Sequence, residues 1–274
     1  MTADWMSLKG QEPSAPAGID TSVPHSARIW NYWLGGKDNF AIDRAVGDQV
    51  RAMFPDIALV ARVQREFLAR AVSYLAGPAG IRQFLDVGTG LPSANNTHQV
   101  AQRVAATARV VYVDNDPIVL AHARALLTSN PEGATAYVDA DMRDSARILT
   151  AAGEILDLTQ PVALMMLGIL GHVGSDEEAA SIVCALLGGL VPGSYLVLAD
   201  GVNTSQAGNE AQARYNEQAP IPYHLRSPER VAALFTGLEL VDPGVVPSSE
   251  WRPDPEASTK LPEAAVRCGV AVKP

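Results

Sequence analysis

Beyond Gly77-Pro78 the chain alternates short apolar runs of strand length with longer segments of helical periodicity. Such an alternation is typical of βα units, in which helices cover both faces of a parallel sheet. It predicts an α/β fold with a seven-stranded, mostly parallel sheet. The expected strands are residues 83–87, 109–113, 134–138, 162–167, 194–199, 238–241 and 265–272. The expected helices are residues 96–106, 117–128, 145–152, 175–187, 207–218 and 228–236.

The residues before this alternation show helical patterns only. The spacing of apolar side chains predicts helices over residues 27–34, 43–53 and 57–75, the first of them capped by Ser26. The first 23 residues are rich in Pro, Gly, Ser and Ala and lack apolar periodicity, which indicates a flexible arm. The expected organisation is an arm over residues 1–23, an N-terminal helical cap over 24–78 and a main domain over 79–274, with 207–226 as a candidate lid insertion.

Charge and apolar content limit the partners of the chain. A formal net charge of -9 and a pI near 5.0 disfavour nucleic acid, because binding to a phosphate backbone needs clustered Lys and Arg. The chain has no run of about 18 apolar residues that could span a membrane. Residues 1–11 lack the apolar segment of a secretion signal. We therefore expect a cytoplasmic protein with neither a nucleic acid nor a membrane as its partner.

The two cysteines do not indicate a disulfide framework or a metal site. Cys184 lies in an apolar helical segment and Cys268 in a terminal strand-like run, and neither has the spacing of metal ligands. We predict that both are buried as small apolar residues and that no metal is bound.

The strongest local motif is Phe84-Leu-Asp-Val-Gly-Thr-Gly90, an apolar strand that leads into a Gly-x-Gly turn before a helix. Two missing side chains allow the backbone of such a turn to approach a ligand closely. A tight turn without a ligand has the same pattern, so the motif gains weight only from its surroundings.

Acidic residues follow the next two expected strands. Asp114 ends the second strand, where a carboxylate can accept hydrogen bonds from ribose hydroxyls, and Asp141 follows the third. Taken singly, each is as well explained by a helix cap or a solvated strand end. Together they would lie at the carboxyl edge of the sheet, where α/β proteins bind their ligands.

The charge of this edge distinguishes two classes of ligand. A dinucleotide would bring an anionic pyrophosphate close to the carboxylate of Asp86, and the third position of the dinucleotide fingerprint is Ser93 in place of Gly or Ala. S-adenosyl-L-methionine has no phosphate but carries a sulfonium, an amino group, ribose hydroxyls and an adenine amine, all suitable partners for carboxylates. The acidic edge therefore favours S-adenosyl-L-methionine over NAD.

Three segments resemble the successive cofactor motifs of class I methyltransferases: Asp86-Val-Gly-Thr-Gly90, Val113-Asp-Asn-Asp-Pro117 and Asp139-Ala-Asp-Met142. The segment Ser26-Ala-Arg-Ile-Trp-Asn-Tyr-Trp-Leu-Gly-Gly-Lys-Asp-Asn-Phe40 resembles the opening signature of an actinobacterial S-adenosyl methyltransferase family, formerly a domain of unknown function. The likeness extends over about residues 20–272. It implies a Rossmann-like domain, S-adenosyl-L-methionine as cofactor and S-adenosyl-L-homocysteine as product.

The resemblance also implies roles for individual residues. The methionine end of the cofactor would be held by Asp86, Gly88 and Gly90. Asp114 would bind the ribose, and Asp141 with Met142 the adenine. Further cofactor contacts expected in the same loops are Thr89, Asn115, Leu167 and Gly168.

The segment after the fourth strand departs from the common pattern. Class I methyltransferases often have Leu-His-hydrophobic-hydrophobic-Pro-Asp there, whereas this chain has Leu170-Gly-His-Val-Gly-Ser-Asp176. His172 is a candidate general base, but a histidine bonded to the backbone at a strand end explains it more simply. A base is also optional, because alignment and exclusion of water can supply most of the acceleration of methyl transfer.

The cap and the candidate lid supply the expected acceptor contacts. Arg28, Tyr32 and Asn39 are predicted to face the cofactor or the acceptor, with Tyr32 as a second catalytic candidate. A helix surface and an Asn-capped turn explain these three residues about as well. Trp30 and Trp33 are predicted to be core residues, with stacking on an aromatic acceptor as the alternative. Further candidates with polar or aromatic tips are Lys37, Arg214, Tyr215, His224 and Arg226.

Three functions are compatible with these features. The first is methyl transfer from S-adenosyl-L-methionine to an unidentified small-molecule acceptor, on its oxygen, nitrogen or carbon. The second is an NAD-dependent oxidoreductase, against which the charge of Asp86 counts. The third is a non-catalytic module that binds the cofactor on the same fold.

Overall fold

The computed structural model of the chain describes residues 20–126, 129–254 and 265–274. Most of the predicted flexible arm, residues 1–19, lies outside the described residues. The same holds for residues 127–128 at the end of one expected helix and for residues 255–264.

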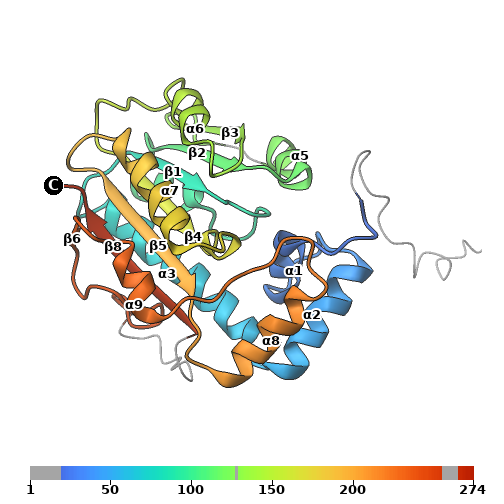
Figure 1. Ribbon diagram of the computed structural model, residues 1–274. Helices are drawn as coiled ribbons and strands as arrows, with labels where there is room; N and C mark the ends of the chain where they lie inside the picture. The colour runs from blue at the N-terminus through green and yellow to red at the C-terminus, as the bar shows by residue number, and fades with distance from the viewer. Residues whose placement is uncertain (1–19, 127–128, 255–264) are drawn as a thin grey trace, which may run out of the picture.

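A mixed sheet of eight strands forms the centre of the molecule, in the order β3-β2-β1-β4-β5-β8-β6, with β7 paired to β8 (Figure 1). The strands are β1 (Gln83–Val87), β2 (Arg109–Asp114), β3 (Ala134–Asp139), β4 (Ala163–Leu167), β5 (Tyr195–Gly201), β6 (Glu239–Leu240), β7 (Val246–Pro247) and β8 (Val266–Val272). The first five pair in parallel, and β8 runs antiparallel to β5. The Rossmann-like, mostly parallel sheet is confirmed; the short β7 is an eighth strand that was not expected.

Helices cover both faces of the sheet because its central strands are apolar at successive positions. Leu85 belongs to one core cluster and its neighbour Phe84 to the other, as the alternation of side chains along a strand requires. The first cluster is covered by α6 (Ser145–Ala152), α7 (Asp176–Gly188) and α9 (Pro228–Ala233). The second is covered by α3 (Ile57–Ala76) and α4 (Thr97–Val104). Near the carboxyl edge, α5 (Pro117–Leu126) contributes to a smaller cluster.

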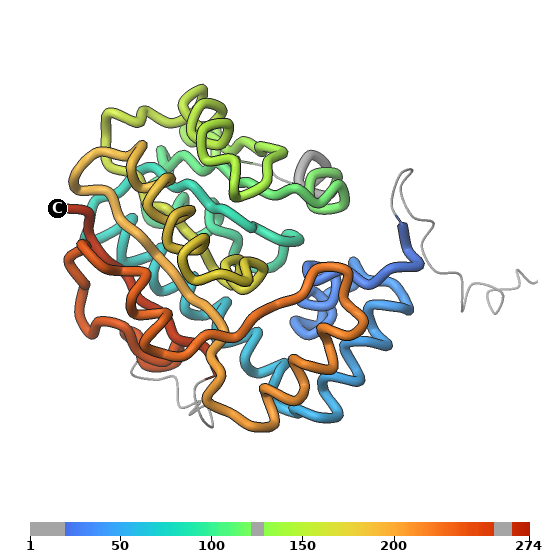
Figure 2. The backbone as a smooth tube through the Cα atoms, in the orientation of Figure 1, coloured from blue at the N-terminus to red at the C-terminus, as the bar shows by residue number. Residues whose placement is uncertain are grey.

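A helical lobe lies beside the carboxyl edge of the sheet. It consists of α1 (Ser26–Trp33), α2 (Ala41–Met53) and α8 (Gln206–Asn216), which share a core of Ile29, Val46, Val50, Ala211 and Tyr215. Figures 1 and 2 show these three helices side by side, apart from the sheet. The lobe differs from the predicted cap, because α8 comes from the candidate lid and much of α3 covers the sheet.

Polar residues of the opening segment hold the lobe together. Asp43 is fully buried; its carboxylate accepts hydrogen bonds from the backbone N–H groups of His25 and Phe40 and lies 2.9 Å from Nε of Arg28. The amide of Asn31 accepts hydrogen bonds from the N–H of Asp38 and from the side chain of Asn39. Asn31 fits only because residue 36 is a glycine, whose added Cβ would lie 2.3 Å from the Asn31 amide.

Two local predictions were wrong. His25, not Ser26, is the N-cap residue of α1, and its Nδ1 atom lies 3.3 Å from the backbone nitrogen of Ala27. Cys184 is exposed, because it lies on the face of α7 that points away from the sheet; Cys268 is buried as expected. No helix in the described part of the chain has the length and apolar content needed to cross a membrane.

Candidate functional site

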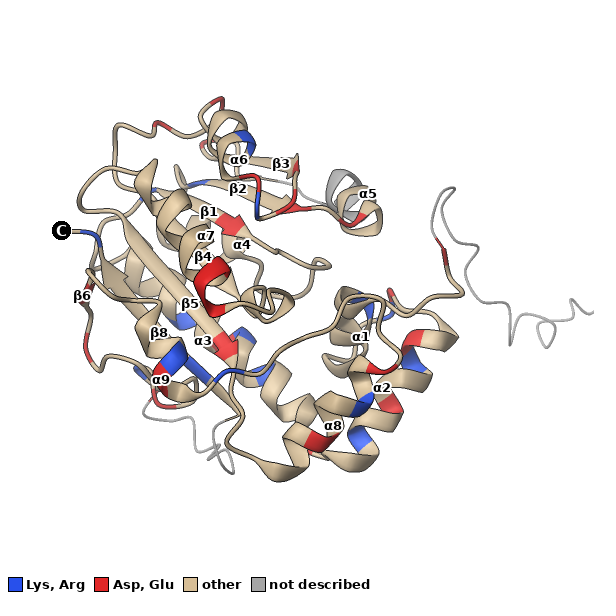
Figure 3. Cartoon of the chain, viewed as in Figure 1, with Lys and Arg blue, Asp and Glu red and all other residues tan. Residues whose placement is uncertain are grey.

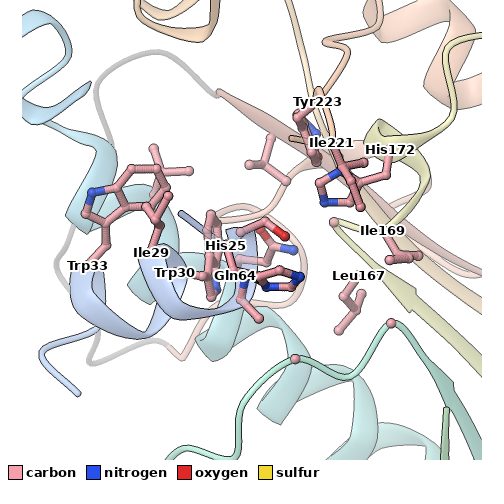
Figure 4. Close-up of a pocket in the computed structure, with 18 of the residues that line it drawn as sticks. His25, Ile29, Trp30, Trp33, Gln64, Leu167, Ile169, His172, Ile221 and Tyr223 are labelled. Carbon is pink, nitrogen blue, oxygen red and sulfur yellow. Dashed lines mark hydrogen bonds between the residues drawn. The ribbon is translucent and has the colours of Figure 1, made fainter. Parts of the chain in front are cut away.

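A cavity of about 320 Å³ lies between the carboxyl edge of the sheet and the helical lobe. The loops after β1, β2, β3 and β4 line one half, and α1, α3, α8 and the segment 221–225 line the other. Figure 4 shows Trp30, Trp33 and Gln64 on one side, and Leu167, Ile169 and His172 on the other. A cavity at this edge is the usual place for a ligand in a fold of this class.

The glycine turn after β1 borders this cavity. Gly88 and Gly90 have positive φ values of 76° and 66°, a region that L side chains rarely adopt. A Cβ at Gly88 would lie 2.4 Å from Ile169, whereas at Gly90 it would meet no atom within 4 Å. The turn therefore requires glycine at position 88 for packing, and at position 90 leaves open space beside the backbone.

Asp114 ends β2 beside the same turn and lines the cavity. Its carboxylate accepts hydrogen bonds from the N–H groups of Gly90 at 2.9 Å and Asp116 at 3.0 Å. Burial raises the pKa of Asp114, although these two hydrogen bonds act in the opposite direction. A carboxylate has about four acceptor sites, so it can still receive two hydroxyl groups from a ligand.

Asp86 does not line the cavity, although it was expected to hold the cofactor with Gly88 and Gly90. Asp86 is 6% exposed, and its carboxylate accepts a hydrogen bond from the Thr97 hydroxyl at 2.6 Å. Burial raises the pKa of Asp86 to about 6, against the lowering effects of Thr97 and Arg65. The carboxylate lies beneath the turn because side chains alternate along β1, and the next residue, Val87, faces the cavity.

The loop after β3 brings Asp141 and Met142 to the cavity, and Asn115 joins them from the loop after β2. The Asn115 amide lies 3.5 Å from the Asp141 carboxylate. Arg143, which the sequence patterns did not single out, also lines the cavity. Its guanidinium pairs with Asp141 at 3.4 Å and with Glu178 at 2.7 Å, so the edge is less acidic than the sequence indicated.

Leu167 and Gly168 line the cavity at the end of β4. Gly168 has a φ of 75°, and an added Cβ would lie 2.9 Å from the amide nitrogen of Gln64. Gln64 projects from α3, was not predicted, and lines the same part of the cavity. A single polar residue on an apolar helix face was its only sequence signal.

His172 lines the cavity just after β4, in a short 3-10 helix over Leu170–His172. Its Nδ1 atom lies 3.1 Å from the carbonyl oxygen of Pro222, and its ring meets that of Tyr223 edge to face. Burial lowers the pKa of His172, although the Pro222 carbonyl acts in the opposite direction. Both the catalytic and the structural interpretations made from the sequence agree with this position.

A buried polar network supports the wall that contains Tyr223. The Tyr223 hydroxyl donates a hydrogen bond to Asp200 and accepts one from the N–H of Gly201 at 3.2 Å. Arg226 donates to Asp200 at 3.0 Å and to the carbonyl oxygens of Leu170 and Val173. Burial raises the pKa of Asp200, while Tyr223 and Arg226 lower it. Asp200 and Tyr223 were missed because the sequence does not show that they meet.

The lobe brings some predicted residues to the cavity and keeps others away. Trp30, Trp33 and Tyr215 line it; Trp33 also packs against the core of the lobe, whereas Trp30 is a half-buried cavity residue in place of the core residue predicted. Arg28 and Asn39 do not line it, because their polar atoms are used inside the lobe. Three more predicted residues do not line the cavity. Tyr32 donates a hydrogen bond to Asp48, and Arg214 pairs with Glu217. The third is His224.

Comparisons with known proteins agree with this architecture. Residues 12–274 match the model of a family described as S-adenosyl methyltransferase. A DUF574 family protein from Streptomyces avermitilis MA-4680 is 44% identical with a TM-score of 0.89, covering 93% of this chain and 99% of that one. A proposed methyltransferase from Thermobifida fusca YX is 40% identical with a TM-score of 0.87, covering 95% and 98%.

A more distant structure shares the fold alone. Human N-acetylserotonin methyltransferase, solved in complex with S-adenosyl-L-methionine, is 12% identical with a TM-score of 0.50, covering 90% of this chain and 66% of that one. No curated protein matches the sequence.

Proposed function

The chain belongs to the S-adenosyl methyltransferase family, whose cofactor is S-adenosyl-L-methionine, and we propose that it methylates a small molecule held in the cavity. The observation that carries this proposal is the position of the cavity between the glycine turn and the helical lobe. One half presents the residues expected to hold the cofactor, and we assign the other half to the acceptor. S-adenosyl-L-homocysteine is the product that remains after transfer.

The residues at the carboxyl edge fit the cofactor. Gly90 leaves its backbone open to the cavity, and Asp114 beside it retains free acceptor sites for ribose hydroxyls. Asp141 and Asn115 offer polar atoms, and Met142 an apolar surface, for an adenine ring. We also propose that Gly88, Thr89, Leu167 and Gly168 contact the cofactor. Asp86, which lies beneath the glycine turn, is proposed to support that turn.

Methyl transfer needs the acceptor in line with the bond that breaks. When bound, the cofactor supplies a methyl carbon on a cationic sulfur, and the electron pair of the carbon–sulfur bond stays on sulfur as the acceptor's lone pair forms the new bond. The protein holds the cofactor and the acceptor in this in-line arrangement and excludes water, and these two effects account for much of the acceleration of methyl transfer. The glycine turn and the helical lobe, on opposite sides of the cavity, are suited to that task.

His172 is the proposed group for taking the proton that the acceptor loses. Burial lowers the pKa of His172, which favours the neutral imidazole. If Nδ1 donates its proton to the Pro222 carbonyl at 3.1 Å, then Nε2 carries a free lone pair and can accept one. Tyr32 is not retained as a catalytic candidate, because its hydroxyl bonds to Asp48 outside the cavity.

The test is calorimetric titration of the protein with S-adenosyl-L-methionine, S-adenosyl-L-homocysteine and NAD in parallel. We expect micromolar affinity for both adenosyl ligands and no heat from NAD. NAD binding alone would support the oxidoreductase, which the family membership already disfavours. Binding of the adenosyl ligands without methyl transfer to any member of an acceptor panel would support the non-catalytic module.

A further inference from the structure

The cavity has a charged half and an uncharged half. The side chains of Asp, Glu, Lys or Arg that line it are Asp114, Asp141 and Arg143, all at the carboxyl edge of the sheet. Among the described residues of α1, α2, α3, α8 and segment 221–225, none of these four types lines the other half. His25 and His172 also line the cavity (Figure 4).

The uncharged half is not explained by a lack of charge in the lobe. Figure 3 shows both acidic and basic residues along α2 and α8. These residues use their charges elsewhere: Asp43 faces Arg28, Asp48 accepts from Tyr32, and Arg214 pairs with Glu217. A charged molecule in this half would therefore lose its hydration without gaining an opposite charge.

Two indole rings form part of the uncharged half. Trp30 and Trp33 are half-buried, with ring centroids 5.8 Å apart and an angle of 69° between the rings. The indole N–H of Trp33 already donates to the carbonyl oxygen of Gly47 at 3.2 Å. What such rings offer to an occupant is an apolar aromatic surface, which favours a flat apolar partner.

Gln64 supplies the one buried amide between the two halves that lacks a partner in the described structure. Its side chain is 7% exposed, lines the cavity and makes no hydrogen bond to any described residue. It lies beside Gly168, next to the proposed cofactor position. The Gln64 amide is open to the cavity, and an amide both donates and accepts, so an occupant of the cavity can bind to it.

We propose that the acceptor is an uncharged molecule with a flat, apolar body, and that the Gln64 amide binds its polar group. This inference rests on the proposed methyl transfer and narrows it to neutral hydroxyl or amine compounds of aromatic character. Phosphorylated, carboxylated and nucleic acid acceptors are disfavoured by the same argument, because no Lys or Arg lines this half among its described residues, and the one histidine at its edge, His25, already faces the carboxylate of Asp116.

The test uses three probes with the same ring system and different charge: 2-naphthol, 2-naphthoate and 2-naphthylmethylammonium. Each is titrated at pH 7 into the full chain, with and without saturating S-adenosyl-L-homocysteine. A phenol is neutral at this pH. We expect the dissociation constant of 2-naphthol to be at least about tenfold lower than that of either charged probe, since a charge would be desolvated without compensation.

Variants locate the binding group. Gln64→Leu should weaken 2-naphthol binding about fivefold to tenfold, the usual effect of losing one hydrogen bond, and leave the affinity for S-adenosyl-L-homocysteine unchanged. Gln212→Leu is the matched control, because Gln212 lines the same cavity but its amide already donates to Asn216 at 3.0 Å. Trp30→Ala should also weaken 2-naphthol binding, by removing the aromatic wall.

Several outcomes would overturn the inference. These are equal or tighter binding of a charged probe, no binding of 2-naphthol at about 1 mM, or a Gln64→Leu variant that binds it normally. Loss of S-adenosyl-L-homocysteine binding in Gln64→Leu would instead assign the amide to the cofactor. Failure of the unmodified protein to bind S-adenosyl-L-homocysteine counts against the proposed function, while the titrations without it still measure the preference for neutral probes.

Discussion

Asp86 and Asp114 lie near the carboxyl ends of the neighbouring parallel strands β1 and β2, but their side chains have different surroundings. Asp114 lies beside the cavity and receives two backbone N–H groups, so its removal affects the turn and any ligand there. Asp86 lies beneath the turn with the Thr97 hydroxyl as its hydrogen-bond donor. Because burial raises its pKa to about 6, Asp86 links the stability of the fold to pH.

The first prediction concerns Asp86→Asn and the pH dependence of stability. The pKa of Asp86 is about 6 in the folded chain and near 3.8 in the unfolded chain. The contribution of this group to the free energy of unfolding is therefore fully present below pH 4 and is lost as the pH rises through 6. Two pKa units correspond to about 3 kcal/mol. The stability of the variant should not fall in this way as the pH rises, because an asparagine can accept the hydrogen bond from Thr97 but does not ionise. Urea unfolding of both proteins between pH 4 and 7 measures the difference.

All other carboxylates titrate alike in the two proteins, so their curves should diverge only between about pH 4 and 6. Asp139→Asn, at an exposed carboxylate at the end of β3, is the control and should give a curve parallel to that of the unmodified chain. Parallel curves for Asp86→Asn as well would show that Asp86 ionises normally in the fold.

The second prediction separates the two glycines of the turn. Gly90→Ala should fold with a loss of about 1–2 kcal/mol from its positive φ but bind S-adenosyl-L-homocysteine at least about tenfold more weakly, because its methyl group enters the open space of the cavity. Gly88→Ala should lose more stability, since its Cβ would lie 2.4 Å from Ile169. Thermal unfolding and calorimetry test both. Normal affinity in Gly90→Ala would remove Gly90 from the cofactor site.

At the scale of elements, the sequence predicted what depends on periodicity. The order of strands and helices follows from apolar spacing, and each expected element lies within about three residues of its predicted bounds. Asp114 and Asp141 could be placed because the ends of parallel strands meet at one edge of a sheet. The orientation of Asp86 could not be predicted. Which side chains of β1 face the cavity depends on which side of the sheet the helical lobe covers, and the sequence does not show this.

Contacts between distant segments were not predictable in the same way. Gln64 and Gly168 meet because α3 crosses the end of β4, and no local pattern records that crossing. Arg28 was expected at the ligand but faces Asp43, since a charged pair buried inside the lobe looks like two surface charges in the sequence. Tyr223 and Asp200 were missed for the same reason: they come from a loop and a strand 23 residues apart.

The third prediction tests how segment 221–226 is held against the sheet. Arg226→Met removes the partner of the buried Asp200 and the donor to the carbonyl oxygens of Leu170 and Val173. Breaking a buried pair on one side costs about 3–5 kcal/mol. Arg230→Met is the control: Arg230 lies 3.5 Å from Asp176 but is 63% exposed, so its loss should cost less than about 1 kcal/mol. Similar denaturant midpoints for the two variants would contradict this role of Arg226.

At the scale of the whole molecule, the cavity lies between two packed parts, the sheet with its covering helices and the helical lobe. The continuous helix α3 connects them through the chain, and its later part belongs to the core of the sheet. A second connection is polar: Nδ1 of His25, at the start of α1, lies 2.9 Å from the carboxylate of Asp116, at the start of α5. Both halves of the site therefore depend on how the lobe is held.

The last prediction tests that polar connection with Asp116→Asn. Burial alone would raise the pKa of Asp116, but His25 lowers it below its ordinary value, which indicates a favourable contact with the ionised carboxylate. Asparagine removes the charge but can still accept from the N–H of Ile118, which Asp116 does at 2.8 Å. The backbone amides of α1 should exchange with deuterium about fivefold faster, an effect of about 1 kcal/mol, and those of β1 and β4 at their original rate.

The control variant is Tyr32→Phe, which removes only the hydrogen bond to Asp48 on the outer surface of the lobe and should leave the exchange of α1 unchanged. Equal exchange in both variants would show that the contact between His25 and Asp116 does not hold α1 in place.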